Sequence, residues 1–157
     1  MRQGVRLGVD VGTVRIGVAR SDLHGMLTTP VETVARGSGD VERILAIAAD
    51  IDAMELIVGL PLSLAGTATA STADATGFAR RLAAATELPV RLVDERLSTV
   101  SAQVALRASG RSSRGSRPVI DQVAAVIIVQ HALDLERNAG TPPGDIAHPD
   151  EGQHNGR

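Results

Sequence analysis

The chain has 157 residues, a net charge of −2 at pH 7, no cysteine and a single aromatic residue, Phe78. The lack of cysteine excludes disulfides, thiolate metal sites and cysteine nucleophiles. The scarcity of aromatic side chains argues against proteins that bind single strands by base stacking. Apolar runs fall short of the roughly 20 residues of a membrane span, and no signal-peptide core opens the chain. We therefore expect a cytoplasmic, membrane-independent protein.

Three strands are predicted to open the chain, over residues 5–11, 15–21 and 27–35, as an antiparallel meander joined by short turns. Apolar residues at helical spacing then predict a helix over about 40–51. The apolar run at 55–60 is typical of a buried parallel strand. After the loop SLAGTATAST, a second helix carries its apolar face at 75–83.

The second half of the chain predicts one strand and two helices before a polar end. The strand VRLV (90–93) runs directly into Asp94, Glu95 and Arg96. Helices are expected over about 99–108 and 119–137, the latter buried because it is apolar almost all round. From residue 138 to 157 the composition favours a disordered tail. The element order predicts one α/β domain, residues 1–137, with a mixed sheet flanked by helices.

Four carboxylates stand at positions where chemistry could be placed. Asp10 lies within an apolar strand, where burying a charge without a partner costs several kcal/mol. Asp94 and Glu95 end the last predicted strand, and Asp121 begins the last helix. If the first strand is central in the sheet, these acids can converge. Each of the other three alone also fits a turn, a helix cap or a solvated loop, whereas the flanks of Asp10 predict a buried strand rather than a turn.

Convergence of these acids would demand neutralisation. Two carboxylates about 5 Å apart repel by roughly 3 kcal/mol at an effective dielectric constant near 20. Protons or a divalent cation must then offset the repulsion, and an all-oxygen ligand set favours Mg²⁺ or Mn²⁺. Such ions, held by carboxylates, support hydrolysis of phosphodiesters. Gly8 and Gly12, on the same face as Asp10, could leave room for a substrate backbone, or could serve close helix packing and a tight turn.

Four blocks along the chain resemble the successive signatures of the YqgF-type Holliday-junction-resolvase-like proteins, also called pre-16S rRNA nucleases. The blocks are LGVDVGTVRIGVARSD, IVGLPLSLAGT, LVDERLST and IDQVAAVIIVQHALD, in the family's order over residues 7 to about 135. The resemblance implies an RNase H-like fold with a five-stranded mixed sheet whose strands 1–3 are antiparallel. This agrees with the element order inferred from the residues. Val14, where many relatives carry lysine, is a departure.

The resemblance implies a metal-dependent nuclease with a triad of catalytic, metal-binding acids. By matching motifs these are Asp10, an acid of the DER block, and Asp121. We expect Glu95 rather than Asp94 as the middle member, because neighbours on a strand point to opposite faces. Arg15 and Arg96 fall within matching blocks and would suit phosphate contacts, or ion pairs with local acids.

A cluster of arginines without any acid fills the stretch RASGRSSRGSR. It is predicted to be a mobile arm that binds phosphates and gives salt-sensitive affinity, or else a solvated linker. Its basic residues are Arg107, Arg111, Arg114 and Arg117.

The resemblance favours maturation of the 5′ end of 16S rRNA, with pre-rRNA and ribosomal particles as partners. No predicted helix presents an exposed apolar face for a dimer, so we expect a monomer or weak homodimer. Two alternatives are resolution of four-way DNA junctions and a non-catalytic assembly factor that binds nucleic acid. Asp-x-Gly-Thr on a hairpin also resembles the phosphate loop of actin-like ATPases. Those proteins need two such domains, and 157 residues with no second copy are too few.

Overall fold

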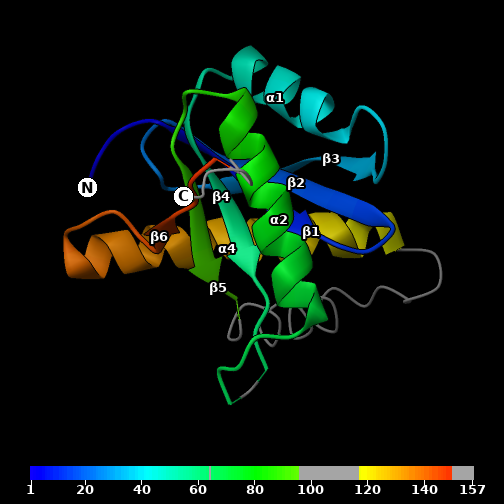
Figure 1. Ribbon diagram of the computed structural model, residues 1–157. Helices are drawn as coiled ribbons and strands as arrows, with labels where there is room; N and C mark the ends of the chain where they lie inside the picture. The colour runs from blue at the N-terminus through cyan, green and yellow to red at the C-terminus, as the bar shows by residue number, and fades with distance from the viewer. Residues whose placement is uncertain (64, 96–116, 150–157) are drawn as a thin grey trace.

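A single mixed sheet organises the protein, shown in Figure 1 as a computed structural model that describes residues 1–63, 65–95 and 117–149. The spatial order of the strands is β3-β2-β1-β4-β5-β6. The first three pair antiparallel, β4 joins β1 and β5 joins β4 in parallel, and β6 returns antiparallel to β5. The strand bounds are β1 (Val5–Val11), β2 (Arg15–Ser21), β3 (Thr28–Ala35), β4 (Ala53–Leu60), β5 (Val90–Asp94) and β6 (Asp145–Ile146).

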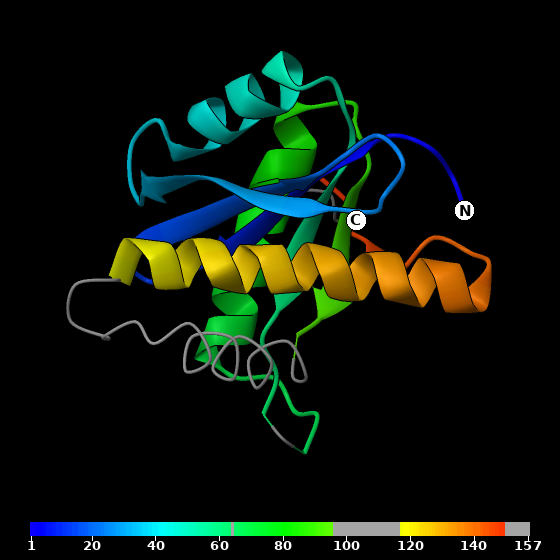
Figure 2. The same ribbon diagram turned by 180° about the vertical axis from the view of Figure 1, so that it is seen from behind.

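Helices cover both faces of this sheet. The helices α1 (Asp40–Asp50) and α2 (Ala70–Ala85) lie on one face, and α4 (Arg117–Ala139) crosses the other (Figures 1 and 2). Parallel neighbours in a sheet must be joined by crossover connections, which usually contain a helix. Here α1 precedes β4 and α2 joins β4 to β5, and both helices cover the same face of these parallel strands. The result is a three-layer arrangement with β1 and β4 at its centre.

The alternation of residues along β1 divides it between the two faces. Leu7 and Val9 are fully buried in the larger core, which includes Phe78 of α2. Gly8 and Asp10 point the other way, toward α4. A smaller apolar cluster, containing Ile57 and Val93 from the sheet and Ile128 and Ala132 from α4, fixes the helix on that face. Asp10 is therefore presented beneath α4 rather than in the main core.

The predicted mixed sheet with antiparallel strands 1–3 is confirmed, but it has six strands rather than five. The sixth lies within the stretch expected to be a disordered tail from residue 138. There α4 continues to Ala139, Asp145 and Ile146 pair with Leu92 and Arg91, and Ala147 is buried. Polar composition did not indicate this strand, because it forms by pairing with the free edge of β5. The predicted helix at 99–108 lies outside the described residues.

The last helix, expected to be buried, is buried along the side that packs on the sheet. Ala125, Val129 and Leu133 are buried against the sheet, whereas Val126 and Ile127 are only half-buried. A helix lying on one face of a sheet has one contact side, whatever the composition of the other. Within the described ranges, no helix combines the length and apolar character needed to cross a bilayer.

Candidate active site

Asp10 lies near the end of the central strand β1, on the face that α4 covers. Its partner across the antiparallel β1–β2 pair is Gly17, and it is half-buried. Burial raises the pKa of Asp10 to about 6, and the negative charge of Asp121 adds to this effect. The structure thus answers why an acid sits in an apolar strand: it belongs to a cluster of acids rather than to a turn.

Glu95 follows directly after β5 and brings a second carboxylate to the same face. A Cβ placed on Gly59 of β4 would overlap Glu95 Oε2 and the Cδ1 of Ile128, so the carboxylate lies between the sheet and α4. Burial raises the pKa of Glu95 to about 7, with further contributions from the charges of Asp10 and Asp94. Strand alternation would direct Asp94 to the opposite face, and the choice of Glu95 over Asp94 as the middle acid stays a prediction.

Asp121 is brought to the site by close approach of α4 to β2. A Cβ on Gly17 would overlap the backbone carbonyl oxygen of Asp121, so only glycine lets the helix approach this near. The next residue, Gln122, donates a hydrogen bond from Nε2 to Thr33 Oγ1 on β3 at 2.9 Å. Figure 2 shows the yellow start of α4 lying across the blue strands at this point.

The electrostatics join the three acids through Asp10. The charge of Asp121 raises the pKa of Asp10, and the charge of Asp10 raises that of Glu95. Acids from β1, from the end of β5 and from α4, separated by up to 111 positions in sequence, thus share one end of one face of the sheet. A bound cation would relieve the repulsion among these partly buried carboxylates.

The chemistry of this donor set fits a hard divalent cation, since it offers carboxylate oxygens only. Among the residues that the structure describes, however, no three His, Asp or Glu side chains are close enough together to hold one ion as they stand. The Asp121 carboxylate is directed elsewhere, because Arg15 Nε donates to its Oδ2 at 3.1 Å. Of the two sequence interpretations of Arg15, ion pairing is therefore the one that the structure displays.

Four of the five remaining arginines predicted to contact nucleic acid lie outside the residues that the structure describes. Arg96, Arg107, Arg111 and Arg114 fall between residues 96 and 116, and Arg117 is the first residue of α4. Their proposed contacts remain predictions.

The two glycines beside Asp10 serve the fold rather than substrate clearance. The space beside Gly8 is filled by the Val129 side chain and the Ala125 carbonyl of α4, and a Cβ on Gly12 would crowd the Arg15 carbonyl across the tight β1–β2 turn. The close-approach glycines that shape the site are Gly17 and Gly59, which sequence reasoning missed. Their signal was a glycine inside an otherwise apolar strand.

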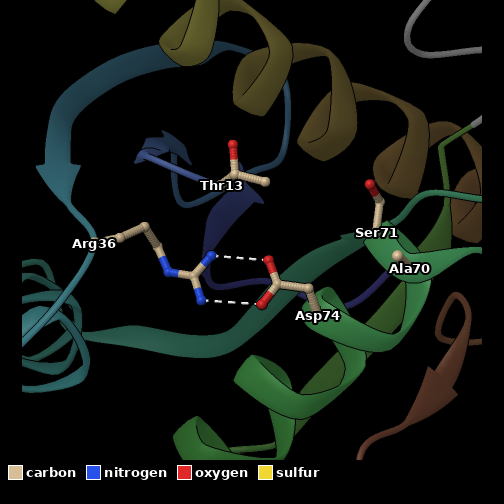
Figure 3. A pocket seen from close by; sticks show the side chains of 5 residues that line it. All are labelled: Thr13, Arg36, Ala70, Ser71 and Asp74. Atoms are coloured by element: carbon tan, nitrogen blue, oxygen red, sulfur yellow. Dashed lines mark hydrogen bonds and ion pairs between the residues drawn. The ribbon is translucent and has the colours of Figure 1, made fainter.

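A pocket of about 370 Å³ lies on the other side of the β1–β2 turn, lined by Thr13, Arg36, Ala70, Ser71 and Asp74 (Figure 3). Inside it the Arg36 guanidinium makes two hydrogen bonds to the Asp74 carboxylate, at 2.9 and 3.0 Å. The charge of Arg36 is therefore already matched. None of the three clustered acids lines this pocket.

Comparison with known proteins finds similarity over most of the chain. A protein of Clavibacter michiganensis subsp. michiganensis (strain NCPPB 382) is 74% identical over 149 residues, which cover 93% of this chain and 92% of that protein. A protein of Leifsonia xyli subsp. xyli (strain CTCB07) is 62% identical over 151 residues, covering 95% and 97%. Both bear the name "Putative pre-16S rRNA nuclease".

Among solved structures, T. thermophilus RuvC in complex with Holliday junction substrate superposes with a TM-score of 0.54 at 14% identity, covering 89% of this chain and 99% of that one. The likeness shows the fold alone, which is RNase H-like. With its acids on the α4 face, the protein is a hydrolase of the nuclease class, acting on phosphodiester bonds. The family model "RuvX: Holliday junction resolvase" matches residues 4–135, and the chain belongs to this family.

Proposed function

We propose that this protein is a metal-dependent endonuclease in which Asp10, Glu95 and Asp121 hold the catalytic Mg²⁺ or Mn²⁺. The observation that carries the proposal is the placement of these three acids, from three elements, on one end of one sheet face. A glycine beneath Glu95 and another beneath the Asp121 backbone make the placement possible. The cluster lies beside the end of β1, on the face that α4 covers.

The residues of the chain would act by binding and by charge. When bound, the cation supplies Lewis-acid stabilisation of the phosphoryl transition state and an activated water. Asp10, shared between the other two acids, would be the central ligand. Glu95, whose pKa is raised to about 7 by burial and by the charge of Asp10, can hold or release a proton near neutral pH before a cation binds. Gly17 lets the Asp121 backbone, and Gly59 the Glu95 carboxylate, lie close against the sheet on this face.

The substrate we propose is the 5′ region of pre-16S rRNA, free or within ribosomal particles in the cytoplasm. The names of the two close relatives support this choice. A four-way DNA junction is the second candidate, because the matching family is described as a Holliday junction resolvase. Arg96, Arg107, Arg111, Arg114 and Arg117 are proposed to contact phosphates of the nucleic acid, and the protein to work as a monomer or weak homodimer.

The test is a cleavage assay with Mg²⁺ or Mn²⁺ on a 5′ precursor fragment of 16S rRNA and on a four-way DNA junction. Asp10→Asn, Glu95→Gln and Asp121→Asn are each expected to lower the rate about a hundredfold or more, as when other groups that stabilise developing charge are removed. Asp94→Asn is the matched control, since it removes a neighbouring acid of the opposite face.

Preference for one substrate decides between the two candidates. Full activity in Asp10→Asn would contradict the proposed site, and a loss in Asp94→Asn as deep as in Glu95→Gln would contradict the choice of Glu95. Binding of both nucleic acids with cleavage of neither would indicate the assembly factor instead of an enzyme.

A further inference from the structure

The contact between Arg15 and Asp121 joins the start of β2 to the first turns of α4, across 106 positions of sequence. Arg15 Nε lies 3.1 Å from Asp121 Oδ2, and the two side chains are 35% and 23% exposed. The pair is therefore partly withdrawn from solvent, and water screens it less than a fully exposed pair.

The backbone of Asp121 has little freedom of its own. Its carbonyl oxygen packs on Gly17, and the neighbouring Gln122 is hydrogen-bonded to Thr33 of β3. With the main chain held from two sides, the direction of the Asp121 carboxylate is set by rotation of the side chain. In the structure Arg15 determines that direction.

We propose that Arg15 is a positioning residue that competes with the divalent cation for the Asp121 carboxylate. This inference rests on the proposed function, because it concerns the third ligand of that metal site. The competition explains why three clustered acids do not yet converge closely enough to hold one ion in the described part of the chain. A cation must draw Asp121 away from Arg15, and the released guanidinium then lies beside the site where a substrate phosphate could bind it.

The consequence is that removal of Arg15 should strengthen metal binding, which is opposite to the effect of losing an ordinary phosphate contact. A residue that only touches nucleic acid would leave the affinity for a metal ion unchanged when no nucleic acid is present. A general loss of positive charge near the site would also favour a cation, but it would do so whether or not Asp121 is charged.

The experiment is a calorimetric titration of the full chain with Mn²⁺ in the absence of nucleic acid. The proteins are wild type, Arg15→Gln, Asp121→Asn, the double variant and Asp10→Asn. Arg43→Gln is the matched control, because Arg43 pairs with Glu32 in a similar arginine–carboxylate contact on α1, away from the site. Circular dichroism and thermal unfolding establish that each variant is folded.

We expect Arg15→Gln to tighten Mn²⁺ binding about two- to fivefold, the range for release of a part-exposed ion pair. In the Asp121→Asn background the same substitution should have no effect, and Arg43→Gln should equal wild type. Unchanged or weakened affinity in Arg15→Gln would overturn the inference, as would equal tightening in both backgrounds. Failure of wild type to bind Mn²⁺, or undiminished binding by Asp10→Asn, would overturn the proposed metal site as well, so the two failures are distinguishable.

Discussion

Asp10 and Gly17 lie directly opposite each other in the β1–β2 pair, and the main chain of α4 rests on the glycine. Gly17, the cross-strand neighbour of Asp10, thereby sets the position of Asp121. Two members of the acid cluster are thus linked through the backbone of Gly17, which has no side chain.

Replacing Gly17 by alanine should harm both stability and cleavage. The added methyl group would meet backbone atoms of Asp121 and Gln122, which cannot rotate away as a side chain can. Overpacking of this kind costs about 1–3 kcal/mol, and moving the start of α4 should lower cleavage at least tenfold. Chemical unfolding and the cleavage assay measure the two effects.

Gly77→Ala is the control for that substitution, because a Cβ at this position in α2 meets nothing within 4 Å. It should stabilise the protein by about 0.5–1 kcal/mol, the ordinary gain for a helical glycine, with unchanged cleavage. If Gly17→Ala cleaved RNA or DNA as fast as Gly77→Ala, the role of Gly17 in placing Asp121 would be refuted.

Gly59→Ala should separate activity from stability. The new methyl group would meet Glu95 Oε2 and Ile128 Cδ1, both at the ends of side chains that can give way. We expect a loss of about 1 kcal/mol in the free energy of unfolding, but a larger fall in cleavage, because the Glu95 carboxylate is displaced. Equal cleavage by wild type and variant at saturating Mg²⁺ would show that the position of Glu95 is unimportant.

The stability of the metal-free protein should fall as pH rises from 5 to 8. The pKa of Asp10 is raised from 3.8 to about 6 and that of Glu95 from 4.5 to about 7, chiefly by burial. The folded state therefore binds more protons than the unfolded state in this interval. The stabilisation is complete below the unfolded pKa values and is lost as pH passes the folded ones. For Asp10 it totals roughly 3 kcal/mol, of which about half is lost between pH 5 and 8.

Urea unfolding in EDTA between pH 5 and 8 measures this slope. Asp10→Asn should flatten it and make the protein more stable than wild type at pH 8, whereas Asp50→Asn, at the exposed end of α1, should keep it. Glu136 has the opposite effect on the pH dependence, because hydrogen bonds from Arg2 lower its pKa from 4.5 to about 2. The stability that it contributes is lost only as the pH falls below about 4.5, outside the range of this experiment. A slope identical in wild type and Asp10→Asn would count against the burial of Asp10 as its cause.

A buried ion network holds the opposite end of α4. Glu55, fully buried, accepts hydrogen bonds from Arg2 and Arg91, while Glu136 of α4 pairs with Arg2 and the buried Arg6. Glu55→Gln should lower the free energy of unfolding by about 3 kcal/mol, since it removes the buried carboxylate that Arg91 pairs with and leaves Glu136 alone to balance Arg2 and Arg6.

Glu32→Gln, in the more exposed pair with Arg43, should cost less than about 1 kcal/mol in the same unfolding measurement. Cleavage at low temperature should survive in Glu55→Gln, because Glu136 is 15 residues along the helix from Asp121, roughly 22 Å. A marginal effect of Glu55→Gln on unfolding would mean that the network contributes specificity rather than stability.

Much of the fold could be predicted from local pattern. The apolar runs of β1 and β4 and the helical spacing of α1 carry their own periodicity, whereas the choice of Glu95 over Asp94 stays a prediction from strand alternation. Local pattern could not reveal that α4 crosses β2 at Gly17. That crossing is fixed by tertiary contacts among glycine, Gln122 and Thr33, which lie far apart in the chain.

The same limit explains the two main differences from expectation. An ion pair of Arg15 with a local acid was one of the two expectations, but its partner is Asp121 of a separate motif, which no local pattern indicated. Asp145 and Ile146 form a strand because they pair with the edge of β5. The polar sequence around them carries no strand pattern of its own, and it therefore suggested a tail. Interactions that depend on a partner distant in the sequence were the ones that pattern reasoning missed.

The sixth strand also bears on how the protein behaves at high concentration. A sheet with open edges can recruit strands from other molecules and aggregate. Here one edge ends in β6, only two residues long, and the other, β3, carries Pro30, which has no amide hydrogen to donate, and the charged Glu32. Both borders of the sheet are thus poor templates for a neighbouring chain, which protects a protein with so apolar a central sheet from fibrous self-association.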